Sequence, residues 1–423
     1  MKYTLFKEAD KKIEKDMQEI IKEIRRKIPE VISIFLTGGF SRGEGPVKKV
    51  REGFYPYNDY DIQVITQKKL SKEETDNISI EISKKLGYRG IGYFYNFKKE
   101  EQKFKENFYI DLKVDTPKDL ETLLPRIRTI ELKENSKLLW GKDVRSIIPN
   151  YQLKEIPLAE GAKLLLDRMS QLIQYYSLKK EMDKEFMTYI IQQAYAACCT
   201  SLLLLSKKYE IGYLKSMKIF KENYKTDFPE LYKKSPNLDK KIEEFIKWKS
   251  NPEKLPNRNI DEEWFIVKDN ILEVTKYFFS KFLNKKINTL EELSNGILGM
   301  REQFYLPFLN AIIKNKLKIN LGKINILLLP LVSLILKYKY YQRLKKFKMN
   351  KINIFLEKSP ELIIFGSLIF LIGSIDKNGV NEDLLKKGRE LLGKVYNCKA
   401  KNWEETSLEY ANAYITFFLQ KII

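Results

Sequence analysis

The feature that most constrains the fold is a change in the spacing of apolar residues near Pro157. Before this residue, strand-like segments alternate with segments of helical spacing. After it, from Leu158 to the end, apolar residues recur almost entirely at helical spacing. This order is typical of an α+β head followed by a large all-helical body. We therefore predict two domains, 1–150 and 151–423, of which the second could contain two subdomains.

The first 150 residues predict a mixed sheet with helices packed on it. Residues 7–28 have apolar side chains at helical spacing, and Pro29 ends that helix. Ser71 predicts the N-cap of a second helix that runs to about Leu86. Four segments are strand-like: 31–37, 59–66, 87–97 and 108–117.

Composition narrows the kinds of partner and chemistry. The formal charge of +21 favours anionic partners, although a lysine-rich composition produces the same charge without any ligand. The chain contains no histidine. Ser-His-Asp triads, histidine-dependent metal sites and the kinase catalytic loop are therefore excluded.

Cysteines and apolar segments suggest a cytoplasmic protein without a membrane span. Cys198, Cys199 and Cys398 form no disulfide pattern, and the first two lie in an apolar helical segment. The first residues lack the apolar core of a signal peptide. The apolar segments 324–336 and 362–375 are shorter than the roughly 18 residues that a span needs, so we predict buried helices.

A glycine-rich segment, TGGFSRGEG at 37–45, directly follows the first predicted strand. Glycines at a strand end permit a tight turn and can bring backbone N–H groups close to phosphate. The same residues have structural alternatives. Gly38 and Gly39 could serve only the turn, Ser41 could cap a helix, and Arg42 could pair with a surface acid.

Two predicted strands each offer an apolar face and an acidic face. Asp59 and Asp61 share one side of their strand, because residues two apart do so. In the last strand Asp111 and Asp115 likewise lie opposite the apolar residues. Side by side, these strands would gather three or four mutually repelling carboxylates, which a divalent cation such as Mg²⁺ would stabilise. The alternative is a solvated edge strand, and Asp115, just before Thr-Pro, could simply end its strand.

These motifs together resemble the nucleotidyltransferase superfamily, whose fold is shared with DNA polymerase beta. The resemblance covers about residues 30–145. Gly38 and Gly39 match the paired small residues of the family, and Ser41-Arg42-Gly43 matches the tail that often follows. The remaining matches are Asp59 and Asp61 as the Asp-x-Asp metal ligands, Asp111 as the third carboxylate, and 136–143 as the closing segment.

The resemblance implies an enzyme that moves a nucleoside monophosphate from an NTP such as ATP to an acceptor hydroxyl and releases pyrophosphate. Asp59, Asp61 and Asp111 would hold two Mg²⁺ or Mn²⁺ ions, and Asp111 could receive the proton of the acceptor hydroxyl. Gly38–Gly43 would bind the triphosphate, and the helical body would form the other wall of a cleft. The spacer 40–58 is longer than the family's usual one and predicts a hairpin insertion that turns at Glu52-Gly53.

The acceptor is not determined by the motifs, since a fold does not fix a function. We favour a small-molecule, glycan-precursor or protein acceptor, because no RNA-binding module is recognisable. The alternatives are an RNA-directed nucleotidyltransferase or oligonucleotide synthase and, in another class, a non-catalytic protein that binds nucleotide or a partner.

A basic segment in the helical body raises the RNA alternative again. Residues 303–356 contain many lysines and no acid. Within them, 336–351 interleaves cations with four aromatic residues: Tyr338, Tyr340, Tyr341 and Phe347. Such a segment suits RNA or peripheral contact with an anionic membrane, and it equally suits a solvated lysine face.

Overall fold

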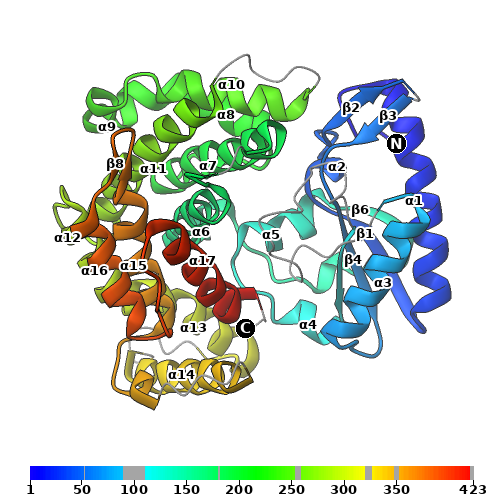
Figure 1. Ribbon diagram of the computed structural model, residues 1–423. Coiled ribbons are helices and arrows are strands. Elements are labelled where there is room, and N and C mark those ends of the chain that lie inside the picture. The colour runs from blue at the N-terminus through cyan, green and yellow to red at the C-terminus, as the bar shows by residue number, and fades with distance from the viewer. Residues whose placement is uncertain are drawn as a thin grey trace.

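A computed structural model of the chain describes residues 1–51, 53–88, 110–179, 182–252, 259–319, 326–346 and 352–419. The protein is an α+β protein, 66% helical, with a small mixed sheet near the N-terminus followed by helices (Figure 1). The predicted fold class is confirmed at this level. The assignment of the first part to a nucleotidyltransferase-like head, and the domain division at 150, stay predictions.

The sheet of the head contains four strands. They are β1 (Val31–Leu36), β4 (Tyr60–Thr66), β5 (Ile110–Asp115) and β6 (Lys137–Gly141). Their order is β5-β4-β1-β6, with β4 and β5 parallel and β1 antiparallel to both of its neighbours. The predicted strands at 31–37, 59–66 and 108–117 are therefore confirmed within the described residues. The strand-like segment 87–97 lies outside them beyond Tyr88.

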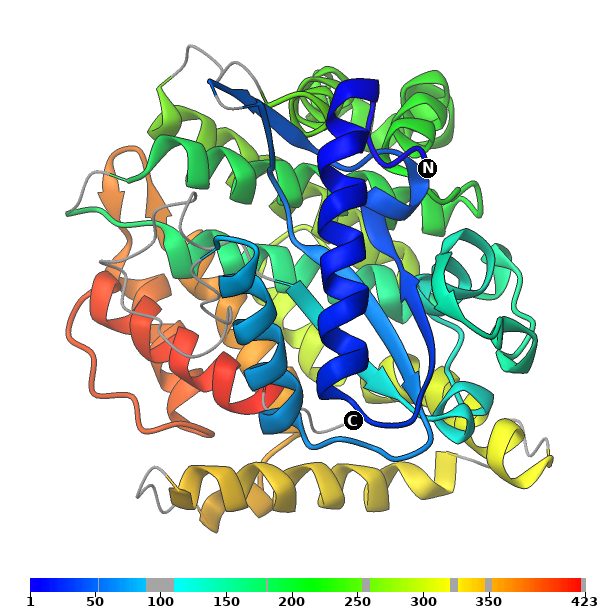
Figure 2. The same ribbon diagram turned by 90° about the vertical axis from the view of Figure 1, so that its right-hand side faces the viewer.

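Two helices, α1 (Lys7–Lys27) and α3 (Lys72–Lys85), cover one face of this sheet (Figure 2). Apolar residues of α1 at helical spacing join Ile62 and Val64 of β4 and Leu112 of β5 in one buried cluster. Helix α3 begins at the predicted cap, where the Ser71 hydroxyl accepts a hydrogen bond from the backbone N–H of Glu74. Because this face buries the apolar residues, the alternate residues of β4 and β5 point to the opposite side.

Short elements connect these strands or follow the last of them. They are α2 (Gly38–Arg42), β2 (Val47–Val50), β3 (Gly53–Pro56), α4 (Pro117–Glu121), α5 (Ile127–Ile130), a π-helical turn η2 (Glu131–Asn135), and 3₁₀ turns η3 (Arg145–Ile147) and η4 (Leu153–Glu155). Strands β2 and β3 pair as the predicted hairpin. The hairpin is tied to the helical body, because the Lys48 ammonium lies 2.7 Å from a Glu185 carboxylate oxygen and the Tyr57 ring packs edge-on against Trp248.

Helices make up nearly all of the rest. They are α6 (Leu158–Tyr175), α7 (Lys184–Leu205), α8 (Tyr213–Asp227), α9 (Pro229–Lys234), α10 (Leu238–Ser250), α11 (Ile260–Phe282), α12 (Leu290–Gly299), α13 (Arg301–Leu317), α14 (Leu329–Lys346), η6 (Ile352–Phe355), α15 (Pro360–Gly373), α16 (Glu382–Gly393), α17 (Trp403–Tyr414) and η7 (Ile415–Leu419). One apolar cluster runs through them from Ala159 to Phe417. A two-stranded ribbon, β7 (Ile375–Asp376) with β8 (Gly379–Val380), corrects the prediction of an all-helical body.

The two apolar segments that we expected to be buried helices differ in how far they are buried. Segment 362–375 is confirmed, because the apolar residues of α15 are buried throughout. The prediction for segment 324–336 is wrong in part, because Leu331, Leu334 and Ile335 of α14 are exposed. Among the described residues, one helix, α7, is long and apolar enough to cross a membrane, and 89% of its apolar window is buried inside the protein. Its apolar character is accounted for by this packing, which also buries Cys198 and Cys199.

Candidate functional site

Three carboxylates meet on the face of the sheet opposite α1 and α3. Asp61 on β4 is directly beside Asp111 on the parallel strand β5, and Asp59 lies just before β4. One carboxylate oxygen from each of the three lies within 4.8 Å of the others, and all three side chains are half-buried. The predicted residues Asp59, Asp61 and Asp111 are thus brought together, which is the spacing that a shared cation requires.

Asp115, the alternative third carboxylate, lies on the same face of β5 but outside this cluster. Its side chain is buried and accepts a hydrogen bond from Gln63 Nε2 at 3.1 Å. The Lys113 ammonium lies 2.9 Å from the same carboxylate. Asp115 is therefore already neutralised within the sheet, whereas Asp111 faces the two other carboxylates.

The electrostatics of the cluster are unfavourable for three ionised carboxylates. Removal from water raises the pKa of Asp61 well above its usual range, and the neighbouring charges of Asp59 and Asp111 raise it further. The Arg128 guanidinium opposes this shift and lies 3.8 Å from an Asp111 carboxylate oxygen. One cation on the protein thus balances part of a threefold negative charge.

The glycine-rich segment brings its backbone against this cluster. It forms the short helix α2, whose first residue, Gly38 (φ 69°), and C-cap, Gly43 (φ 77°), are in the left-handed region. A Cβ atom on Gly38 would lie 2.1 Å from Asp61 Oδ2, so a glycine is required both by the backbone and by the space. The backbone N–H of Thr37 donates to the Asp61 carbonyl at 2.9 Å and fixes α2 to β4. Gly39 has ordinary space around it.

Two polar residues of α2 are engaged within the protein. The Ser41 hydroxyl is buried and donates to the Gly38 carbonyl at 2.8 Å, so Ser41 lies inside the helix and the N-cap alternative is wrong. The Arg42 guanidinium lies 2.6 Å from Glu131 and 3.3 Å from Glu44, with 9% of the side chain exposed. Arg42 therefore pairs with acids, as the structural alternative expected, although these acids are half-buried and not on the open surface.

A pocket of about 360 Å³ adjoins the cluster between the head and the helical body. Thr37, Gly38 and Asp61 line its head side, and residues of α6, α7 and α8 line the other. The expected cleft with one wall from each part is present. Burial raises the pKa of Glu131 at this pocket, while Arg42 and Arg128 oppose the shift.

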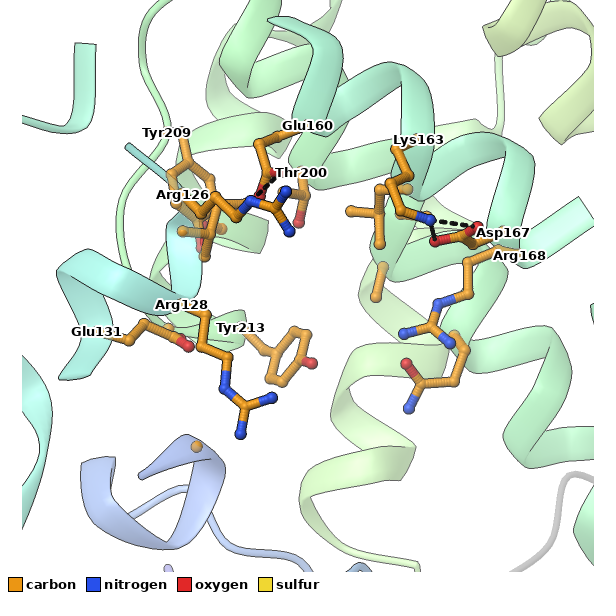
Figure 3. Close-up of a pocket in the computed structure, with 18 of the residues that line it drawn as sticks. Arg126, Arg128, Glu131, Glu160, Lys163, Asp167, Arg168, Thr200, Tyr209 and Tyr213 are labelled. Carbon is orange, nitrogen blue, oxygen red and sulfur yellow. Dashed lines mark hydrogen bonds and ion pairs between the residues drawn. The ribbon is translucent and has the colours of Figure 1, made fainter. Parts of the chain in front are cut away.

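Most of the pocket's cations were missed by the analysis of the sequence. Arg126 and Arg128 precede the turn at Glu131, and Lys163 and Arg168 lie on α6. Figure 3 shows the guanidinium groups of Arg126, Arg128 and Arg168 around one open space. Lys163 and Arg168 could be placed on one helix from the sequence, but nothing there indicated that both line a pocket shared with the head.

These cations differ in how far the protein already neutralises them. The Lys163 ammonium lies 2.9 Å from Asp167, and the Arg126 Nε lies 3.6 Å from Glu160 (Figure 3). Arg168 donates from Nη1 to Gln171 at 2.7 Å, but its Nε is buried with no hydrogen-bond acceptor among the described residues. An unsatisfied buried donor is costly. The guanidinium group of Arg168 lines the pocket, where it is placed to contact an anionic ligand.

Comparison of the chain with protein-family models, curated proteins and solved structures finds no match.

Proposed function

We propose that this protein is a metal-dependent nucleotidyltransferase that moves a nucleoside monophosphate from an NTP to an acceptor hydroxyl. The observation that carries the proposal is the convergence of Asp59, Asp61 and Asp111 within 4.8 Å beside a pocket that Asp61 lines together with several arginines. Carboxylates next to guanidinium groups suit a ligand that brings both phosphate and divalent cations.

The three carboxylates fit a Mg²⁺ or Mn²⁺ site by their chemistry. They provide hard oxygen donors. Burial, and then the neighbouring charges of Asp59 and Asp111, raise the pKa of Asp61, and a bound cation would relieve that charge repulsion. When bound, divalent cations would stabilise the oxygens that enter and leave phosphorus during an in-line displacement. The residues proposed to hold two such ions are Asp59, Asp61 and Asp111.

The chain's own residues would then bind and orient the nucleotide. Arg128 and Arg168 have guanidinium groups that face the pocket, and both are suited to phosphate oxygens. The backbone of Gly38–Gly43 is proposed to contribute N–H groups to the triphosphate, as the resemblance implies. Asp111 is proposed to accept the proton of the acceptor hydroxyl, since it is next to both other carboxylates and exposed enough to return that proton to solvent.

The limited volume of the pocket favours a small-molecule acceptor over a long polymer. Its volume of about 360 Å³ is near the lower end for ligand sites, and α6 and α8 close its far side. Glu160 and Asp167 give that side hydrogen-bond acceptors for a hydroxyl-bearing or amino-bearing molecule.

The test is to supply each NTP, labelled at the α-phosphate, with Mg²⁺ or Mn²⁺ and a cell extract, and to follow both the label and pyrophosphate. We expect metal-dependent transfer that falls by about a thousandfold or more when Asp59→Asn and Asp61→Asn are combined. Binding of Mn²⁺, followed by electron paramagnetic resonance, should be lost in the same variant.

The matched control is Asp76→Asn, because Asp76 lies on α3, across the sheet from the cluster. It should leave Mn²⁺ binding and transfer unchanged. Full activity in the Asp59/Asp61 double variant would remove the proposal. Tight binding of an NTP by the parent protein without any turnover would instead support the non-catalytic alternative.

A further inference from the structure

Helix α14 lies at the edge of the molecule and leaves one of its faces uncovered. In both views it runs along the bottom of the protein, outside the rest of the helical body (Figures 1 and 2). Its inward face is apolar and buried, with Leu336, Tyr340 and Leu344 in the main core. A surface helix would normally be polar on the opposite side.

The outward face of α14 is also apolar. Leu331, Leu334, Ile335 and Tyr338 are each about half exposed. Of the twelve large apolar side chains that are exposed in the described part of the chain, eight lie between residues 319 and 356. Such a concentration is unlike the single exposed apolar residues of an ordinary surface and marks a contact site.

The charge around this face indicates what kind of surface binds to it. The segment 303–356 has no acidic residue, and Lys339 and Lys345 are exposed toward the C-terminal end of the same helix. A second copy of this chain, paired through the same face, would bring lysines of both copies together at a cost in free energy. The complementary surface is therefore negatively charged and also accepts aliphatic side chains.

RNA fits the face less well than a lipid surface. Three of the four exposed apolar side chains on this face are aliphatic, and Tyr338 alone among them has a ring on which a nucleobase could stack. Tyr340 is fully buried, and Tyr341 packs against Phe355 at 5.5 Å between ring centres. Arg343 is also turned inward, where it donates to the carbonyls of Thr416 and Phe417 at 3.0 Å and 2.9 Å.

We infer that the outward face of α14 docks the protein on an anionic membrane surface. Leu331, Leu334 and Ile335 would enter the boundary between headgroups and acyl chains, with Tyr338 at the headgroup level. Lys339 and Lys345 would contact anionic headgroups. This inference does not depend on the proposed catalytic function, since the carboxylate cluster lies in the other part of the molecule.

The experiment is co-sedimentation of the full chain with two kinds of vesicle. One contains phosphatidylcholine alone, and the other contains phosphatidylcholine and phosphatidylglycerol in equal amounts. The parent protein should prefer the anionic vesicles. The triple change Leu331→Ser, Leu334→Ser and Ile335→Ser should reduce its partition by at least about tenfold. The double change Lys339→Gln and Lys345→Gln should reduce it by about five- to tenfold and weaken its dependence on salt.

Matched controls use exposed residues elsewhere on the surface. Leu178→Ser with Leu408→Ser controls for lost apolar area, and Lys7→Gln with Lys11→Gln controls for lost charge. Neither pair should change vesicle binding, and all variants should bind Mn²⁺ as the parent does. This last measurement separates failure at α14 from failure at the carboxylate cluster.

Three results would overturn the inference. The first is equal binding of the parent to neutral and anionic vesicles. The second is a self-association, measured by sedimentation velocity, that the triple serine variant abolishes. The third is binding to homopolymeric RNA that the lysine variant weakens while no vesicle is bound.

Discussion

Two carboxyl groups with raised pKa values, Asp61 and Glu361, lie in different surroundings. Burial is the main cause in both cases. Asp61 has two further carboxylates as neighbours and lines a pocket. Glu361 is almost completely enclosed in the helical body and accepts a hydrogen bond from the Tyr305 hydroxyl at 2.6 Å. A raised pKa alone therefore does not mark a functional site; repelling charges beside an open pocket do.

The largest effect is expected from a change that disturbs the surroundings of Asp61 but removes no carboxylate. Gly38→Ala places a methyl group 2.1 Å from Asp61 Oδ2 and strains a left-handed backbone. We expect the affinity for Mn²⁺, measured by electron paramagnetic resonance, to fall about 10–100-fold. The free energy of unfolding, from urea titration, should fall by about 1–3 kcal/mol.

The adjacent glycine provides the control for that change. A Cβ on Gly39 would meet only ordinary contacts, the nearest being the Glu44 carbonyl oxygen at 3.6 Å. Gly39→Ala should therefore keep most of the Mn²⁺ affinity. Equal affinities in the two alanine variants would show that the contact between Gly38 and Asp61 is unimportant for the cation.

A second test sharpens the role of the pocket's cations. Arg128→Gln removes the guanidinium beside Asp111. Desolvation lowers the pKa of this guanidinium, but the carboxylates of Asp111 and Asp61 outweigh that effect and raise it. Loss of a charged hydrogen-bonding group should weaken NTP binding in the presence of Mn²⁺ about 10–100-fold, measured by isothermal titration calorimetry.

The matched variant for this measurement is Arg25→Gln. Arg25 is exposed on α1 and lies over the Trp140 ring at 4.5 Å, away from the pocket residues. It loses the same charge, so a general effect of the protein's net charge on nucleotide binding would lower both affinities alike. Such a parallel loss would count against a phosphate contact at Arg128.

The smallest effect is expected for a change at Glu361, and it concerns thermal stability. Glu361→Gln keeps an acceptor for the Tyr305 hydroxyl and removes a charge that is costly to bury. Because burial raises the folded-state pKa of Glu361, the parent loses stability as pH rises above the unfolded value of about 4.3. At neutral pH the variant should have a melting temperature about 1–3 °C higher than the parent.

The pH dependence distinguishes this mechanism from a general gain in packing. The difference in melting temperature should vanish below about pH 4, grow with rising pH, and level off once Glu361 is ionised in the folded state. Glu302→Gln, at an exposed position of α13, should show no such trend. A constant difference at every pH would contradict the charge explanation, and Mn²⁺ binding should be unchanged throughout.

Local patterns in the sequence were sufficient for much of the head. Helix α1 follows from apolar residues at helical spacing, and α3 begins directly after Ser71, the predicted N-cap. The alternation in β4 and β5 placed Asp61 and Asp111 on one face, opposite Ile62 and Leu112. These features depend on residues close together in the chain, which is why the carboxylate cluster could be predicted.

The order of a mixed sheet followed by helices was also determined by the sequence alone, because the period of its apolar residues changes once, near Pro157. Only the tertiary structure decided which polar groups are already paired. Arg42 meets Glu131, Asp115 meets Gln63, and Arg168 keeps an unsatisfied Nε at the pocket. It also decided that one face of α14 stays uncovered. These outcomes depend on contacts between residues far apart in the chain, and local spacing carries no information about such contacts.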